Sequence, residues 1–186
     1  RICGSQIGEI DGVKGPDRWL PHLLGHEGGG IVLDTGPGVK KVKNGDRVVL
    51  HWRCSSGIES DPPTYKRGCE IVNAGHVTTF NKFSVVSENR LTPVPKDTDM
   101  EIAALMADTL TTGFGIINND AKLKIGESTV VICCGGIGLG VVLGASLAGS
   151  HPIIAVDIFD HKLKLAKEYG ATHVINSHDV KVKECV

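Results

Sequence analysis

The stretch between Glu127 and Asp157 contains no aspartate, glutamate, lysine or arginine, and it constrains the fold more than any other feature. By length alone it could cross a bilayer. Several glycines and Pro152 interrupt it, however, in a pattern that favours a buried strand, a glycine turn, a tightly packed helix and a second buried strand. We therefore expect a soluble domain here and keep a membrane segment as the weaker alternative.

The same alternation continues beyond Asp157, where an amphipathic run ends at a glycine and a third β-branched run follows. Strands alternating with helices in this order indicate half of a parallel α/β sheet. The predicted elements are buried strands at 129–132 and 153–157, a third strand at 172–175, and helices at 135–149 and 160–169, with Gly170 as the C-cap.

The first hundred residues have a different pattern and are expected to be rich in β structure. The predicted elements are strands at 31–33, 47–50 and 83–86, a turn at Gly36–Gly38, a polar loop at 55–75, a proline-rich end at 91–95 and a helical stretch at 97–118.

Charge and cysteine content narrow the class of protein. A net charge of −1 gives no reason to expect a nucleic-acid partner or an anionic membrane surface. The six cysteines are scattered, apart from one adjacent pair, and do not resemble a disulfide framework. Reduced thiols and the absence of a visible leader lead us to expect a cytoplasmic protein.

The turn after the first α/β strand matches a dinucleotide-binding motif with one departure. The motif Gly-x-Gly-x-x-Gly aligns with residues 133–138, where Cys133 replaces the first glycine. Gly135 allows the backbone to approach a pyrophosphate, and Gly138 allows the helix to pack on the strand. Backbone amides at the start of the helix, around Gly136 and Ile137, are expected to hold the phosphates.

Asp157 ends the second strand, where an acid binds the adenosine ribose hydroxyls and repels a 2′-phosphate. This position favours NAD over NADP, and Lys162 could also reach the ribose. The alternative is that Asp157 is only an N-cap or turn residue.

A second chemical signal is the stretch Gly25-His26-Glu27-Gly28-Gly29-Gly30, where an ionisable pair lies between apolar residues and glycines. His26, Cys3 and Asp108 are candidate metal ligands, because a catalytic zinc uses three protein ligands and one open position. A lone histidine is more often structural and a lone cysteine is often a small buried residue, so spacing alone leaves the metal open.

The same stretch, with Gly36 and Val39 after it, resembles the signature of zinc-containing alcohol dehydrogenases in the medium-chain dehydrogenase/reductase superfamily. Cys3-Gly4-Ser5, Gly45-Asp46-Arg47-Val48 and the segment 108–113 resemble further motifs of that family. The resemblance implies an α/β chain with a GroES-like β-rich catalytic domain at 1–107 and a Rossmann-type dinucleotide-binding domain at 108–186, both incomplete.

The resemblance also implies roles for individual residues. Cys3, His26 and Asp108 would hold one catalytic zinc, with Glu27 as an alternative or supporting ligand. The implied proton-relay hydroxyl is Ser5, the substrate-pocket wall includes Trp52, and Thr112 contacts the nicotinamide of NAD. The implied activity is hydride transfer between an alcohol or polyol and NAD(H), in a protein that forms homo-oligomers at full length.

Several departures from the family pattern limit these expectations. Gly8 stands where some members have a relay histidine, and Gln6 replaces the more usual aspartate. Only Cys54 and Cys69 lie where many members have four clustered cysteines, so we expect no structural zinc. The catalytic domain lacks its first strands and the Rossmann domain its second half, as in a fragment. The alternatives are a zinc-free relative similar to quinone reductases and a non-catalytic nucleotide-binding remnant.

Overall fold

The computed structural model describes residues 2–13 and 15–184. The chain divides into two compact units, Arg1–Asp108 and Thr109–Val186. Each unit has its own sheet, and the fold is mixed α/β with antiparallel strands in the first unit and parallel strands in the second. The predicted fold class is therefore confirmed.

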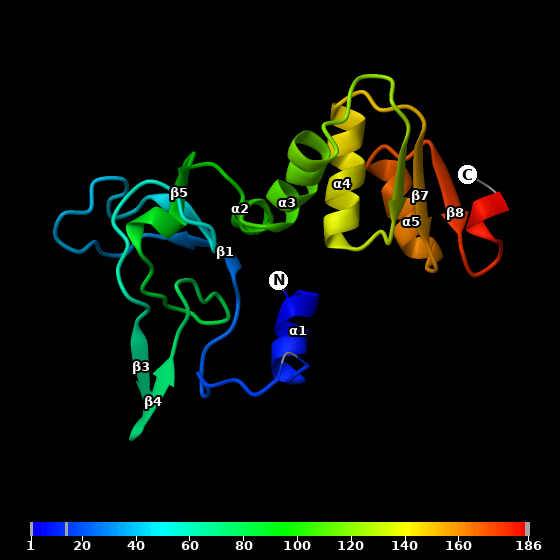
Figure 1. Ribbon diagram of the computed structural model, residues 1–186. Coiled ribbons are helices and arrows are strands. Elements are labelled where there is room, and N and C mark those ends of the chain that lie inside the picture. Colours follow the sequence, from blue (N-terminus) through cyan, green and yellow to red (C-terminus); the bar gives the residue numbers. More distant parts are fainter. Residues whose placement is uncertain (1, 14, 185–186) are drawn as a thin grey trace. The chain divides into compact units, whose positions relative to one another are not determined.

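The first unit is built around a three-stranded antiparallel sheet with the order β1-β2-β5 (Figure 1). Val49 in the central strand pairs with Gly29 on one side and with Thr92 on the other. Val49 also packs with Ala103 and Ala107, while Val42, Val48 and Leu91 form a second cluster of buried side chains. The strands are β1 (Glu27–Ile31), β2 (Arg47–His51) and β5 (Leu91–Val94), and the helices are α1 (Gly4–Ile10), α2 (Met100–Met106) and the 3-10 turn η1 (Glu88–Arg90).

The glycines 28–30 lie inside β1, so the predicted strand at 31–33 begins four residues too late and extends too far. The reason is close packing over the strand. A Cβ on Gly28 would lie 2.8 Å from Thr79 Cγ2, and one on Gly29 would lie 2.8 Å from the carbonyl oxygen of Met100. Glycine is needed here for the approach of neighbouring segments rather than for a turn.

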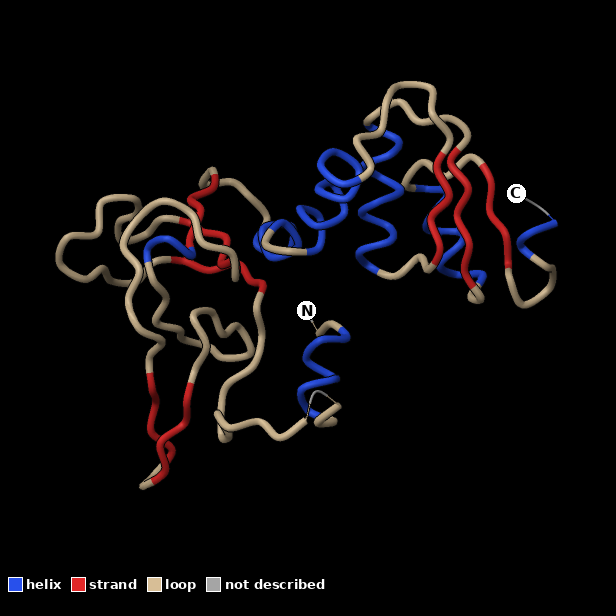
Figure 2. The backbone as a smooth tube through the Cα atoms, in the orientation of Figure 1, coloured by secondary structure: helices blue, strands red, loops and turns tan. Residues whose placement is uncertain are grey.

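Three further expectations for this unit are wrong. The predicted loop at 55–75 contains a hairpin of β3 (Thr64–Arg67) and β4 (Glu70–Asn73), visible as a two-stranded ribbon in Figure 2. Its side chains are mostly exposed on both faces, so no alternation of apolar residues marks it. Residues 83–86 form no strand. The proline-rich end is strand β5, where Pro93 pairs with Val48 at the edge of the sheet, a position that tolerates proline.

The second unit contains the predicted parallel sheet, with the order β6-β7-β8 and the helices α4 and α5 in the crossovers (Figure 1). Val142, Ala145 and Ile153 are among the buried side chains that join helix and sheet. The C-cap of α5 is Tyr169, one residue before the predicted Gly170, and Gly170 follows it with a φ of 113°, as a glycine after a helix often does. The elements are β6 (Thr129–Ile132), α4 (Gly136–Leu147), β7 (Ile153–Asp157), α5 (Asp160–Glu168), β8 (His173–Asn176) and the 3-10 turn η3 (Val182–Glu184).

Two details of the second half differ from expectation. The helical stretch predicted at 97–118 is divided by a turn at Ala107–Asp108 into α2 and α3 (Thr109–Gly115), and a π-helical turn η2 (Ile116–Asp120) follows. Strand β6 is not buried on both faces, because Ile132 is 69% exposed and only Val131 lies in the core. β6 is an end strand of the described sheet, and it is less covered than β7.

No single helix in the described part of the chain is both long and apolar enough to cross a membrane. The pair Met100–Met106 and Thr109–Asp120 passes those criteria only as a bent pair, by length and composition.

Candidate functional site

Three candidate metal ligands that lie far apart in the sequence come into contact in the first unit. Cys3 Sγ lies 3.8 Å from His26 Nε2, and the same nitrogen lies 3.1 Å from Asp108 Oδ2. The histidine is thus between the thiol and the carboxylate. The structure brings together the three residues that spacing alone could not join.

Local backbone geometry places each of these side chains. Cys3 is the N-cap of α1, and Asp108 lies in the turn after α2. His26 follows Gly25, which has a φ of 98° and whose Cβ, if it had one, would lie 2.4 Å from Thr79 Oγ1. Only glycine fits at position 25 without moving its neighbours, so the path of the chain into His26 depends on it.

Two other predicted site residues lie beside these ligands. Ser5 Oγ is 2.8 Å from Cys3 Sγ. Trp52 donates a hydrogen bond from Nε1 to Asp108 Oδ1 over 3.2 Å, and the residue as a whole is about half exposed. Glu27 is buried, with 2% exposure, at the start of β1 opposite His51.

Sequence reasoning noted Gln6 only as a departure from a family pattern, and it missed what this side chain contacts. Gln6 is buried, accepts a hydrogen bond from the backbone nitrogen of Cys3 over 3.2 Å, and contacts His26 Nδ1 through its Nε2. Its position three residues after Cys3, at the start of a helix, is the sequence signal that could have suggested the bond to the Cys3 backbone.

The donor set fits zinc in its chemistry, because thiolate, imidazole and carboxylate are the usual zinc ligands. Zinc bond lengths and tetrahedral angles place a sulfur and a nitrogen ligand about 3.6 Å apart, and a nitrogen and an oxygen ligand about 3.4 Å apart. The two separations in the structure, 3.8 and 3.1 Å, are close to these values. As the side chains stand, however, no three His, Cys, Asp or Glu residues among those described form a complete metal-binding group. His26 and Asp108 are instead in direct hydrogen-bond contact.

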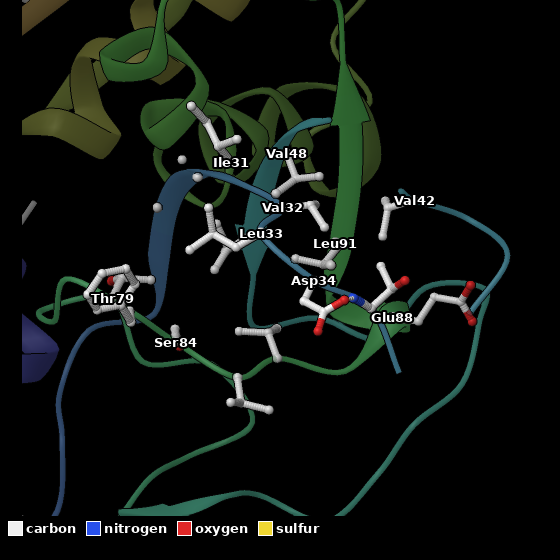
Figure 3. A pocket seen from close by; sticks show the side chains of 18 of the residues that line it. Ile31, Val32, Leu33, Asp34, Val42, Val48, Thr79, Ser84, Glu88 and Leu91 are labelled. Atoms are coloured by element: carbon white, nitrogen blue, oxygen red, sulfur yellow. Dashed lines mark hydrogen bonds between the residues drawn. The ribbon is translucent and has the colours of Figure 1, made fainter. Parts of the chain in front are cut away.

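Among the cavities in the described part of the first unit are two large ones. One, of about 610 Å³, has Gln6, His26 and the Asp17–His22 ion pair in its wall. The other, of about 440 Å³, is lined by apolar side chains that include Val32, Val48 and Leu91 (Figure 3). None of the predicted site residues lines the second cavity, so it contributes nothing to the candidate site.

The turn at residues 133–138, where we predict nucleotide binding, lies in the second unit between β6 and α4. Cys133, at the first glycine position of the motif, has a φ of 74°, which is a left-handed conformation that favours glycine. A Cβ on Gly138 would lie 2.0 Å from the carbonyl oxygen of Cys133. Gly135 is the N-cap of α4 and has open space around it. Gly136 and Ile137 begin the helix, and Thr112 lies on α3.

Asp157 is almost fully buried, with 6% exposure, at the end of β7. Its carboxylate accepts hydrogen bonds from the backbone nitrogens of Cys134, Ile158 and Phe159 over 2.7 to 3.0 Å, and Lys162 Nζ lies 3.8 Å away. Burial opposes ionisation, but these hydrogen bonds and the lysine charge lower the pKa of Asp157 below its ordinary value. Asp157 therefore does act as a turn residue, which was the alternative to a ribose-binding role. The three backbone hydrogen bonds leave about one of the four lone-pair sites of the carboxylate for a ribose.

Comparison with models of known protein families shows which family this chain belongs to. The family model of the alcohol dehydrogenase GroES-like domain matches residues 1–96, which is more than half of the chain. The chain belongs to the alcohol dehydrogenase family. A second model of that family, the zinc-binding dehydrogenase domain, matches residues 136–186. The family resemblance inferred from the motifs is confirmed.

Individual alcohol dehydrogenases agree with this assignment over nearly the whole chain. An S-(hydroxymethyl)glutathione dehydrogenase from Paracoccus denitrificans is 33% identical over 94% of this chain and 53% of its own length. Alcohol dehydrogenase 6 from Peromyscus maniculatus is 33% identical over 96% of this chain and 54% of its own length. The chain therefore spans about half the length of the curated relatives that it matches.

Solved alcohol dehydrogenase structures have the same fold. The benzyl alcohol dehydrogenase from Acinetobacter calcoaceticus superimposes with a TM-score of 0.83 at 31% identity, covering 99% of this chain and 56% of that one. An alcohol dehydrogenase zinc-binding domain protein from Burkholderia ambifaria superimposes with a TM-score of 0.88 at 28% identity, again over 99% of this chain and 56% of the other.

Proposed function

We propose that this chain holds the metal and the nucleotide of a zinc-dependent, NAD-linked dehydrogenase that converts an alcohol or polyol to an aldehyde or ketone. The observation that carries the proposal is the contact of His26 Nε2 with both Cys3 Sγ and Asp108 Oδ2. Three donors from distant segments converge there, and the second family model that matches the chain is described as a zinc-binding dehydrogenase. The named relatives support alcohols as the substrate class.

In this proposal Cys3, His26 and Asp108 hold one zinc ion, and Glu27 is an alternative or supporting ligand. The zinc, when bound, supplies a Lewis acid that lowers the pKa of an alcohol hydroxyl. Asp108 gives this set a harder oxygen ligand in place of a second soft thiolate. Cys54 and Cys69 are both exposed, and we propose no structural zinc in their segment.

The proton of the substrate hydroxyl passes to Ser5 Oγ, which lies 2.8 Å from the proposed thiolate ligand. Gly8 has no side chain to carry that proton further, so water would complete the route. Trp52 forms one wall for the substrate while its indole nitrogen steadies Asp108.

The second unit would hold NAD. Backbone amides of Gly135, Gly136 and Ile137 at the start of α4 bind the pyrophosphate, and Gly138 lets the helix lie against the turn. Asp157 and Lys162 bind the adenosine ribose, and Thr112 contacts the nicotinamide. The acid at the end of β7 favours NAD over NADP, because a 2′-phosphate beside an ionised carboxylate is repelled.

The metal content of the purified protein tests this proposal. We expect about one zinc per chain in the wild type and about none in His26→Ala. His178→Ala is the matched control, because its side chain is 82% exposed, and it should keep the zinc. Zinc near zero in the wild type would contradict the metal site, and about two per chain would contradict the single site.

Turnover and nucleotide binding distinguish the remaining alternatives. The proposed enzyme should oxidise benzyl alcohol or S-(hydroxymethyl)glutathione with NAD and lose this activity when zinc is removed. Activity that survives zinc removal would indicate the zinc-free relative. NADH binding with no turnover of any alcohol would indicate a nucleotide-binding remnant.

A further inference from the structure

The side chain of Gln6 connects two of the proposed zinc ligands, and its chemistry bears on how the site takes up metal. This inference rests on the proposed metal site. Gln6 is 3% exposed, so both ends of its amide need partners within the protein. The oxygen Oε1 accepts from the backbone nitrogen of Cys3 over 3.2 Å, and Nε2 contacts His26 Nδ1.

These two contacts fix the position of the proton on His26. Because Oε1 faces the Cys3 N–H, the amide nitrogen faces the imidazole, and an amide nitrogen can only donate. His26 Nδ1 must then accept, which leaves the ring proton on Nε2. On the other side of the ring, Asp108 Oδ2 lies 3.1 Å from Nε2 and can accept that proton. Two contacts on opposite sides of His26 therefore select the same tautomer.

The selected tautomer is the one that cannot bind a metal through Nε2. A ligating imidazole presents a lone pair to the metal and donates its other N–H to a hydrogen-bond acceptor. For ligation through Nε2, Nδ1 must carry the proton and Gln6 must offer it an oxygen. Rotation of the amide by half a turn provides that oxygen, but it also removes the acceptor from the Cys3 N–H.

We propose that Gln6 is a positioning residue that holds His26 in the Nε2–H tautomer without metal, and that metal uptake requires inversion of the Gln6 amide. The site then has two states. In one, Gln6 caps the backbone of Cys3 and His26 donates to Asp108. In the other, the Gln6 oxygen accepts from Nδ1 and Nε2 is free for zinc.

Histidine side-chain nitrogen NMR on the metal-free protein tests the first state. Wild-type His26 should be in the Nε2–H tautomer, and Gln6→Glu, which offers only acceptors, should convert it to Nδ1–H. Asn44→Asp adds the same charge on an exposed turn and should leave the tautomer unchanged. A wild-type His26 already protonated on Nδ1, or a Gln6→Glu variant that stays Nε2–H, would overturn the proposal.

Zinc titration tests the second state with the same samples. When zinc is added to the wild type, the NMR resonances of the Gln6 side-chain amide and the Cys3 backbone amide should shift as His26 changes to the Nδ1–H tautomer. Gln6→Glu should bind zinc about tenfold more tightly in competition with a chelator, because its carboxylate needs no inversion. Zinc binding without the Gln6 shift, or unchanged affinity in the variant, would overturn the coupling. If the wild type binds no zinc, the proposed function and the coupling both fail, while the tautomer is still decided on metal-free protein.

Discussion

Replacing Cys133 with glycine is expected to stabilise the protein, because Cys133 has a left-handed backbone conformation. Cys133 has a φ of 74° and an exposed side chain. A residue with a Cβ pays about 1–2 kcal/mol in this left-handed region. Glycine avoids that cost but loses about 0.5–1 kcal/mol through the greater freedom of the unfolded chain. Taking the middle of each range, the balance favours Cys133→Gly by about 0.75 kcal/mol.

Thermal unfolding under reducing conditions measures this difference. For a chain of this size the expected gain corresponds to a Tm increase of about 1–4 °C. Cys133→Ala is the control, because it removes the thiol and keeps the Cβ in the left-handed conformation. It should show no such gain. If Cys133→Gly were no more stable than Cys133→Ala, the backbone at position 133 would not be strained.

Three other changes test separate parts of the structure. Ser5→Ala should lower kcat by about 100-fold or more while zinc content stays the same, because it removes a proton carrier and no ligand; full activity would exclude Ser5 from the relay. Asp157→Ala should weaken NADH binding about tenfold and reduce the preference for NADH over NADPH. Fluorescence titration with both nucleotides measures the two dissociation constants, and an unchanged ratio between them would count against the ribose role. Glu88 accepts hydrogen bonds from the backbone of Ile58, Lys40 and Lys41, which lower its pKa below the ordinary 4.5. The ionised Glu88 stabilises the folded protein above pH 4.5, and this stabilisation is lost as the pH falls through the folded-state pKa. The urea concentration at the unfolding midpoint should therefore fall less between about pH 5 and 3 in Glu88→Gln than in the wild type. An equal fall in both proteins would contradict this role of Glu88.

The second unit could be predicted from the sequence because its signals are local. β-branched runs marked the strands β6 and β7, and Gly170 marked the end of α5. The first unit was harder, because its elements depend on distant neighbours. Thr79 and Met100 pack over Gly28 and Gly29 of β1 and leave no room for larger residues, and nothing local to the sequence shows this.

The candidate site also combines features that are local to the sequence with contacts that are not. The types of Cys3, His26 and Asp108 suit a metal, but their spacing did not predict that they meet, and only the family resemblance joined them. The structure now gives their contacts, while their roles as ligands stay predictions. The bond between Gln6 and His26 could not be read from the sequence, since it joins α1 to the segment before β1.

The proline in β5 has a consequence for how this protein behaves at high concentration. β5 is an end strand of the described antiparallel sheet, so one of its sides has no partner strand there. A proline within a paired strand has no N–H, and it fits when that missing donor faces away from the ladder. At Pro93 an incoming strand from another molecule would find one hydrogen bond unavailable. The residue that we first read as the end of a β-rich region thus hinders edge-to-edge aggregation through β5.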